Sequence, residues 1–415
     1  MNSNSSLKHL MYYSWLIWGI AAAFAIFQQY TVSVFGLFSS QFSTMLSVSK
    51  IDISFMSASF FIAFSLMQIP AGLLLDRYSI KVIYRSSIII SLIGLLVFYF
   101  IPYYIPTLIS VYIMGLGMSI SFVGGIMLII RWFPSNRFAL MVGLLGGAQY
   151  FGVALISILS VYIVNHYNIY YLLALLITVN IILLIFIFIF IKPTQADSLR
   201  NYSSKKVYPN IFTSLKGAIL IKDSWYVGIY NSCLLGTAIA FSTFWNFSYQ
   251  KQFDNTATNI TIINSMILIG LALGNPFAGW LSDKIKSRIK PARLFAVLSL
   301  LCLLIILSGI IPTSIIYIIM FLYGFFSNTS AISFAYAKEH TSFQYHGTVC
   351  GLLNTICFIV VTLLQIIPGI FYEKLNFIYS DIYHYSAAFL IFPSLIVIGI
   401  IATFFMNETN CQPVK

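Results

Sequence analysis

The stretch QIPAGLLLDRYSIKVIYR, Gln68 to Arg85, begins as an apolar run, passes a proline and a glycine, and then becomes acidic and basic. A second stretch at 275–293, NPFAGWLSDKIKSRIKPAR, repeats this pattern. In both copies a glycine, an aspartate and a basic residue follow at the same spacing, and matching positions lie half the chain length apart. The matching pairs are Gly72 and Gly279, Asp76 and Asp283, and Lys81 and Arg288. The repeat indicates a duplicated chain with one such turn in each half.

The composition is that of a membrane protein. Hydrophobic residues make up 60% of the chain and charged residues only 8%, whereas a soluble domain carries about 25% charged residues. We therefore interpret the net charge of +12 as basic loops on one membrane face, and we expect no nucleic-acid partner. The five cysteines form no CxxC pair and no Cys/His ligand spacing, so neither a metal nor a cofactor is expected.

Apolar stretches of about 20 residues match the thickness of a bilayer crossed by α-helices. The sequence predicts an all-α membrane protein with twelve transmembrane helices in two pseudo-symmetric six-helix halves. The spans are expected at 14–38, 53–75, 82–101, 107–130, 138–163, 169–191, 225–248, 260–281, 292–311, 313–336, 347–370 and 385–406. Every third span is almost purely apolar, which predicts a peripheral position for it.

The longest polar interval, 192–224, is expected to be a cytoplasmic linker. It separates an N-terminal six-helix half, 1–191, from a C-terminal six-helix half, 225–415. With twelve spans, only Lys50, Lys251 and Lys374 of the 22 Lys and Arg residues fall on the side opposite the termini. The positive-inside rule therefore places both termini in the cytoplasm.

The two halves, the linker and the repeated turn resemble the major facilitator superfamily of secondary transporters. In that family the turn after the second helix reads G-x-x-x-D-[RK]-x-G-[RK]-[RK]. Gly72, Asp76, Arg77 and Lys81 match it, but Ser79 stands where the second glycine is usual. The second copy keeps its glycine, aspartate and basic residues, and it also lacks that glycine.

A second motif begins at Arg131, which is followed by Trp-Phe-Pro, by Arg137 and then by Gly143. It resembles the loop between helices four and five of family members that carry organic anions, amino acids or peptides. The region Gln28–Tyr30 and the abundance of Ile, Tyr, Asn and Phe resemble the amino-acid and nutrient transporters of intracellular bacteria. This resemblance implies a multi-pass protein of a bacterial inner membrane, and we expect a monomer.

The repeated turn is a candidate cytoplasmic gate. The Asp76 carboxylate is expected to pair with Arg131 or Arg137, or to cap a helix, when the inner side is closed. The alternative is a solvated turn residue that only helps to orient the chain. The expected gate residues are Gly72, Asp76, Arg77, Lys81, Arg131, Arg137, Gly279, Asp283 and Arg288. We expect Asp76→Asn to lower transport with little loss of folded protein.

Uncharged polar residues are the candidates for substrate binding, because transporter sites lie near the bilayer midplane between the repeats. Among them Gln28, Gln149 and Asn328 rank first. The full set is Gln28, Gln29, Tyr30, Tyr112, Ser119, Gln149, Tyr150, Asn231, Thr237, Trp245, Asn328 and Asn354. For each residue the alternative role is an interhelical hydrogen bond, worth under about 1 kcal/mol.

No Asp, Glu, Lys, Arg or His is expected near the middle of a span. This favours a neutral or zwitterionic substrate, an amino acid or short peptide, moved by facilitated diffusion or by a coupling that the sequence does not locate. An organic-anion or sugar transporter of the same fold, or a non-transporting nutrient sensor, remains the alternative. A membrane enzyme would need clustered reactive side chains inside the spans, which the sequence lacks.

Overall fold

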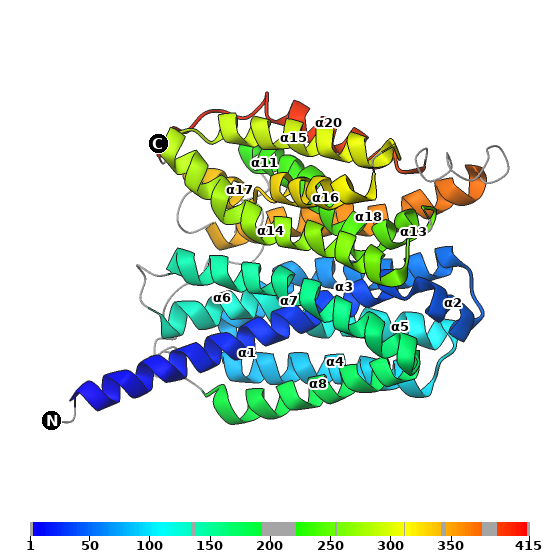
Figure 1. Cartoon of the computed structure of the whole chain (residues 1–415). Coiled ribbons are helices and arrows are strands. Elements are labelled where there is room, and N and C mark those ends of the chain that lie inside the picture. The colour runs from blue at the N-terminus through cyan, green and yellow to red at the C-terminus, as the bar shows by residue number, and fades with distance from the viewer. Residues whose placement is uncertain are drawn as a thin grey trace.

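The computed structural model describes residues 3–133, 138–192, 221–253, 255–310, 312–341, 346–375 and 388–412. In Figure 1 the helices α1 to α8 form one group, and α11 to α20 form a second group stacked against it. Both chain termini lie at the same end of the bundle, which we call the terminal end. The helices α2 and α13 mark the other end, which we call the opposite end (Figure 1).

The first group contains eight helices that together make six long apolar segments, because α5 and α6 are one nearly continuous segment and α2 is short. The helices are α1 (Ser3–Leu37), α2 (Ser39–Leu46), α3 (Lys50–Arg77), α4 (Ile80–Phe100), α5 (Tyr104–Met118), α6 (Ile120–Trp132), α7 (Phe138–His166) and α8 (Ile169–Phe190).

The second group repeats this plan with one added feature, two π-helical turns in its first segment. The elements are α11 (Lys222–Asn231), η2 (Ser232–Gly236), α12 (Thr237–Ala240), η3 (Phe241–Trp245), α13 (Asn246–Lys251), α14 (Ala257–Ile285), α15 (Ile289–Leu307), α16 (Thr313–Ser327), α17 (Ser330–Glu339), α18 (His346–Leu375) and α20 (Ile391–Ala402). The π-turns η2 and η3 interrupt the segment that runs from α11 to α13, and such turns are frequent at functional sites.

Eleven helical segments in the described residues are long and apolar enough to cross a membrane, and each matches a predicted span. The twelfth span, expected at 385–406, corresponds to α20, a shorter apolar helix of 12 residues. Residues 376–387, which precede it, lie outside the described part of the chain. The predicted all-helical membrane fold is confirmed.

Side chains at the helix starts satisfy backbone N–H groups that have no partner within the helix. Ser49 Oγ accepts from the Asp52 N–H at 3.3 Å, and the Asp52 carboxylate accepts from the Ser49 N–H at 2.9 Å. This reciprocal capping box fixes where α3 begins. Asn168 and Thr256 cap α8 and α14 by the same side-chain acceptance.

The first segments of the two groups form the centre of the protein. In α1 and in the segment from α11 to α13, 89% of the apolar window is buried, against 28–67% in the other nine segments. The helices α4, α8 and α15 pack mainly on neighbours within their own group, as their apolar composition predicted.

The main contacts between the groups join α3 with α18, α7 with α14, and α1 with η3 and α13. The rings of Phe64 and Phe358 meet at 4.6 Å between α3 and α18. A Cβ on Gly36 of α1 would lie 2.2 Å from the Thr243 carbonyl oxygen of η3, so these backbones are in close contact. These contacts lie at mid-height or nearer the opposite end, where the groups are pressed together.

Candidate functional site

The first polar cluster consists of Gln28 on α1 and Gln149 on α7. Gln149 Nε2 donates to Gln28 Oε1 at 3.0 Å, and both side chains are buried, with exposed fractions of 7% and 2%. An amide offers two N–H donors and one carbonyl acceptor. One mutual bond therefore leaves the pair with further donors and acceptors for a bound molecule. The structure brings together two of the three residues that rank first in the sequence.

The neighbours of Gln28 on α1 differ in their partners. Gln29 is buried and its Nε2 has no hydrogen-bond partner within the described residues. The Tyr30 hydroxyl is hydrogen-bonded to Ser160 Oγ of α7. The Tyr30 hydroxyl thus forms a hydrogen bond between α1 and α7, which is the alternative role given above for each candidate residue. The Gln29 side chain, in contrast, has an N–H donor without a partner among the described residues.

The second polar cluster consists of Asn231, Asn328 and Ser330. Ser330 Oγ lies 3.3 Å from Asn231 Oδ1 and 3.1 Å from Asn328 Oδ1. The hydroxyl has one proton, so it can donate to either of these amide oxygens. Asn328 separates α16 from α17 with φ −98° and ψ 91°, and its Nδ2 donates to the Leu271 carbonyl oxygen at 2.9 Å. Asn231 Nδ2 is buried without a partner among the described residues. The cluster joins α11, α14 and α17 and retains a free donor.

The two clusters lie on either side of the contact between α7 and α14. A Cβ on Gly147, two residues before Gln149, would meet the Ala272 carbonyl oxygen at 3.9 Å. Ala272 directly follows Leu271, which accepts the bond from Asn328. Asn328 lies at the middle of its span, and Gln28, Gln149 and Asn231 lie about a third of the way in from one end of theirs. A pair of amides in the first group, and two amides with a serine in the second group, thus lie in the interior of the spans.

Three other predicted residues use their polar atoms within the helix bundle. Trp245 Nε1 donates to the Leu364 carbonyl oxygen of α18 at 2.7 Å. Thr237 Oγ1 donates to backbone carbonyls of η2, the nearest at 2.7 Å, and Ser119 Oγ donates to Leu116 at 2.7 Å. The alternative role, stabilising helix packing, accounts for these three contacts.

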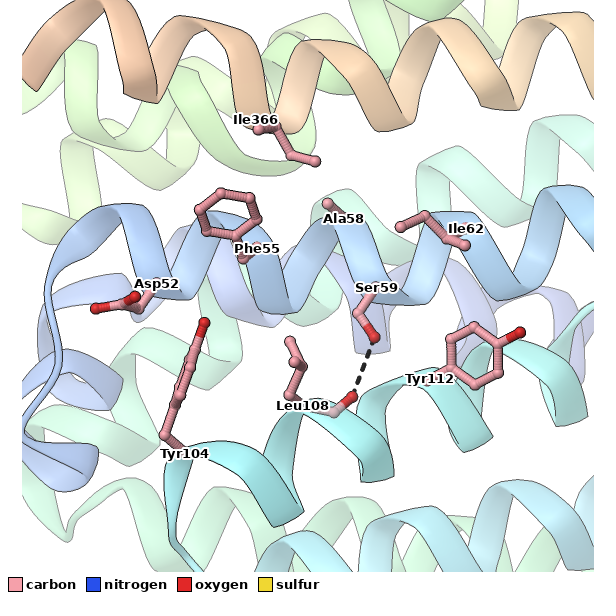
Figure 2. Close-up of a pocket in the computed structure, with 9 residues that line it drawn as sticks. All are labelled: Asp52, Phe55, Ala58, Ser59, Ile62, Tyr104, Leu108, Tyr112 and Ile366. Carbon is pink, nitrogen blue, oxygen red and sulfur yellow. Dashed lines mark hydrogen bonds between the residues drawn. The ribbon is translucent and has the colours of Figure 1, made fainter.

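The remaining predicted residues, Tyr150, Asn354 and Tyr112, form no hydrogen bond with either cluster among the described residues. Tyr150 on α7 and Asn354 on α18 are half-buried. Tyr112 lines a groove between α3 and α5, on the side of the bundle shown in Figure 2. The structure therefore does not bring Tyr112 to the polar clusters.

A further set of polar side-chain contacts near the opposite end involves residues outside the final set of predicted binding residues. Asn246 Nδ2 donates to Asn264 Oδ1 at 2.9 Å, and Gln365 Nε2 donates to Thr243 Oγ1 at 3.0 Å. The signal was present in the sequence, since Asn264 and Gln365 are isolated polar residues inside apolar spans. These bonds hold η3 and α13 against α14 and α18.

The expected gate is described only in part. The side chains of Asp76 and Arg77 and all of Arg137 lie outside the described residues, so the proposed pairing of Asp76 stays a prediction. A Cβ on Gly72 would meet no atom within 4 Å. Lys81 forms no hydrogen bond or ion pair with the second group among the described residues. Arg131 is partly buried at the end of α6.

The second copy of the turn forms a buried ionic network. Arg288 is 8% exposed; its Nη2 lies 2.6 Å from Glu339 Oε1 of α17, and its Nη1 lies 2.7 Å from Asp283 Oδ1. Burial alone would lower the Arg288 pKa, but the hydrogen bonds to Glu339 and Asp283 raise it above its ordinary value. Gly279 lies one turn before Asp283 on α14 and faces Ala331. The network ties α14 to α17 at the terminal end.

The segment after α20 completes this network. Glu408 accepts from the backbone N–H groups of Arg288 at 2.8 Å and Ile289 at 3.2 Å, which caps α15. Burial would raise the Glu408 pKa, but hydrogen bonds from Ser287 and these N–H groups lower it below its ordinary value. Sequence reasoning missed Glu339 and Glu408, because no motif links residues that far apart in the chain.

Comparison with known proteins identifies the family. A model of the major facilitator superfamily matches residues 10–365. A search of curated proteins found no match. Among solved structures, the crystal structure of a D-xylose–proton symporter is similar with a TM-score of 0.75 and 11% sequence identity, over 97% of this chain and 100% of that chain. The chain therefore belongs to the major facilitator superfamily and is a secondary transporter, not an enzyme.

Proposed function

We propose that the protein moves a small neutral or zwitterionic organic nutrient, an amino acid or short peptide, across a membrane. The observation that carries this proposal is the position of two uncharged amide clusters, at Gln28–Gln149 and at Asn231–Asn328, on either side of the α7–α14 contact. Amide groups bind both a carboxylate and an ammonium group, because they donate and accept hydrogen bonds. A zwitterion is therefore matched without a charged side chain.

The distribution of charge supports a substrate without net charge. In the described spans every Asp, Glu, Lys, Arg and His lies within the first or last two turns. A carrier of multiply charged anions would be expected to hold a cationic side chain in its centre, and proton relays use central ionisable groups. We therefore propose facilitated diffusion without proton coupling.

The mechanism that we propose is alternating access, in which the two helix groups rock about the midplane site. The named contacts between the groups lie from mid-height to the opposite end, including the backbone contact of Gly36 with Thr243. This arrangement corresponds to a carrier closed at the opposite end. To open there, α1 must separate from η3 and α3 must separate from α18.

The orientation, the location and the two six-helix halves belong to the same proposal. We propose cytoplasmic termini, because Lys and Arg concentrate on the terminal side. We also propose a monomer in a bacterial inner membrane, with halves at 1–191 and 225–415 joined by a cytoplasmic linker at 192–224. The segment 193–220 lies outside the described residues.

A sugar is the second candidate substrate. The D-xylose–proton symporter shares the fold, and amide groups can also donate hydrogen bonds to hydroxyl groups and accept hydrogen bonds from them. An organic anion would draw on Arg131, which lies at the end of α6 and not in either cluster. A sensor that has lost transport would bind the nutrient at the same clusters without moving it.

Competition in proteoliposomes tests the substrate class. The purified protein would be reconstituted, and uptake of labelled neutral amino acids would be measured against unlabelled amino acids, dipeptides, hexoses, pentoses and dicarboxylates. We expect amino acids or dipeptides to compete and dicarboxylates not to compete. Competition by sugars or dicarboxylates alone would reject the proposed class, and saturable binding without uptake would favour the sensor.

A further inference from the structure

A groove of about 480 Å³ lies between α3, α5 and α18, away from the amide clusters. Figure 2 shows its walls: Phe55 and Ile62 project from α3, Leu108 lies on α5, and Ile366 extends from α18. Ser59, at the floor, donates its hydroxyl to the Leu108 carbonyl oxygen at 3.0 Å. The floor hydroxyl is thus already hydrogen-bonded, and the walls of the groove are mainly apolar.

The groove faces the lipid side of the bundle. On α3, Phe55 and Ile62 are 36% and 38% exposed, and Leu66, one turn further, is 62% exposed. On α5, Ile105 and Ile109 beside the groove are 58% and 54% exposed. In a membrane protein such a continuous exposed apolar surface contacts hydrocarbon chains.

One end of the groove is polar, and this end lies where two helices begin. Asp52 is in the first turn of α3, and Tyr104 is the first residue of α5. From Asp52 to Ile62 the helix rises about 15 Å, which is half of the roughly 30 Å hydrocarbon core. The groove thus runs from the membrane interface to mid-depth, the depth of one leaflet.

The polar end is acidic. The Asp52 carboxylate accepts from the Ser49 N–H at 2.9 Å and from Ser49 Oγ at 2.7 Å, and the Tyr104 hydroxyl points toward it (Figure 2). Asp52 is the one acidic residue among those that line the groove, and no Lys or Arg lines it. A carboxylate with a neighbouring phenol complements an ammonium group and repels an anionic head group.

We propose that this groove binds one phospholipid of the leaflet at the opposite end, a lipid with an ethanolamine head group. One acyl chain lies between Phe55, Leu108 and Ile366, and the ammonium group meets the Asp52 carboxylate. Because the lipid bridges α3 and α18, which belong to different helix groups, it stabilises the contact that closes the opposite end. This site is separate from the proposed substrate site and does not depend on it.

Photoreactive lipids test the proposal. The full-length protein would be reconstituted in phosphatidylcholine vesicles with a trace lipid that carries a photoreactive acyl chain, under either an ethanolamine or a glycerol head group. Labelled peptides would be mapped by mass spectrometry. We expect peptides of α3 and α5 that line the groove to be labelled about threefold more by the ethanolamine lipid, the size of effect that one partly exposed ion pair gives.

Variants separate the chain and head-group contacts. Asp52→Asn is expected to reduce ethanolamine-lipid labelling to the level of the glycerol lipid. Ile62→Trp fills the inner part of the groove and is expected to remove labelling by both lipids. The matched control is Ile109→Trp, at an exposed position outside the groove, which should label like the wild type.

Equal labelling of the wild-type groove by the two lipids, or preference for the glycerol lipid, would overturn the head-group assignment. Unchanged labelling in Ile62→Trp would overturn the acyl-chain assignment. Size-exclusion profiles establish that each variant is folded. If Ile62→Trp fails to fold, the comparison of the two lipids on the wild-type protein still decides.

Discussion

The side-chain amide of Gln149 donates to the side-chain amide of Gln28 at 3.0 Å, and this bond joins α7 to α1 in the interior of the first helix group. Both residues are buried: Gln28 lies on α1, the most enclosed helix of the first group, and Gln149 lies on the face of α7 that packs against it. The proposed amino-acid substrate would form its hydrogen bonds with such groups, because no ionisable side chain of the described spans lies near the middle. The pair therefore gives the first test of the site.

Gln149→Ala is expected to lower the apparent affinity for substrate about two- to twelvefold, since one lost hydrogen bond is worth about 0.5–1.5 kcal/mol. The measurement is the KM of uptake in proteoliposomes, together with the amount of folded protein. The matched control is Gln68→Ala, because Gln68 is also a buried glutamine, but its Nε2 faces the Phe64 carbonyl oxygen of its own helix. Equal loss in both variants would argue for a packing role.

Loss of Arg288 and loss of its exposed partner Asp283 are expected to lower the stability of the protein by different amounts. Glu339 has a side chain 11% exposed, whereas Asp283 is 69% exposed. Arg288→Met leaves Glu339 buried without its cation and should cost about 3–5 kcal/mol. Asp283→Asn removes an exposed partner and should cost under about 1 kcal/mol. Thermal denaturation in detergent measures both, and equal destabilisation would contradict the network.

Glu408 is expected to stabilise the protein in a pH-dependent way. Its pKa is lowered, although burial opposes this, because Ser287 and three backbone N–H groups bond its charged form. A lowered pKa means that the stabilisation is present above the ordinary value of 4.5 and is lost as the pH falls through the lower folded value.

Glu408→Gln should therefore have a lower Tm than the wild type at pH 7, and the difference should shrink as the pH falls below 4.5. Thermal denaturation over a series of buffers measures this. A difference in Tm that stays constant down to pH 3 would show that the carboxylate charge is not responsible.

Gly274 and Gly143, which each lie four residues from another glycine in an apolar helix, are expected to respond differently to substitution by alanine. A Cβ on Gly274 of α14 would lie 2.0 Å from the Phe325 carbonyl oxygen of α16, whereas a Cβ on Gly143 of α7 would meet no atom within 4 Å. Gly274→Ala should cost about 1–3 kcal/mol through overpacking. Gly143→Ala should be neutral or slightly stabilising, because alanine is the better helix former. Detergent melting curves compare the two.

These glycines also show what a sequence can predict. Three pairs of glycines lie four residues apart in apolar spans: Gly143–Gly147, Gly270–Gly274 and Gly347–Gly351. This spacing predicts close helix packing, and chance spacing is the alternative. The prediction is confirmed at Gly270 and Gly274, whose added Cβ atoms would collide with the backbone of α16, and it is wrong at Gly143 and Gly351, where an added Cβ would meet no atom within 4 Å. The difference depends on which helix lies opposite, and a single sequence does not specify that.

The fold was predictable because the bilayer imposes strong rules on length and hydropathy. Eleven predicted spans are confirmed as helices of spanning length. The interior position of Gln28 and Gln149 was also predictable, since amides in apolar spans avoid lipid. Their mutual bond was not predictable, because it joins residues far apart in the chain and depends on the packing of α1 on α7. Arg288 and Glu339 are a second example of this kind.

Counterflow in proteoliposomes tests the central claim most directly. Vesicles would be loaded with unlabelled amino acid, and entry of the labelled form would be followed with no pH gradient and with an imposed one. The proposed carrier, with uncharged clusters at Gln28–Gln149 and Asn231–Asn328, predicts rapid counterflow without a gradient and no added accumulation when the gradient is imposed. Accumulation driven by the pH gradient, or absence of counterflow with every amino acid and dipeptide, would contradict it.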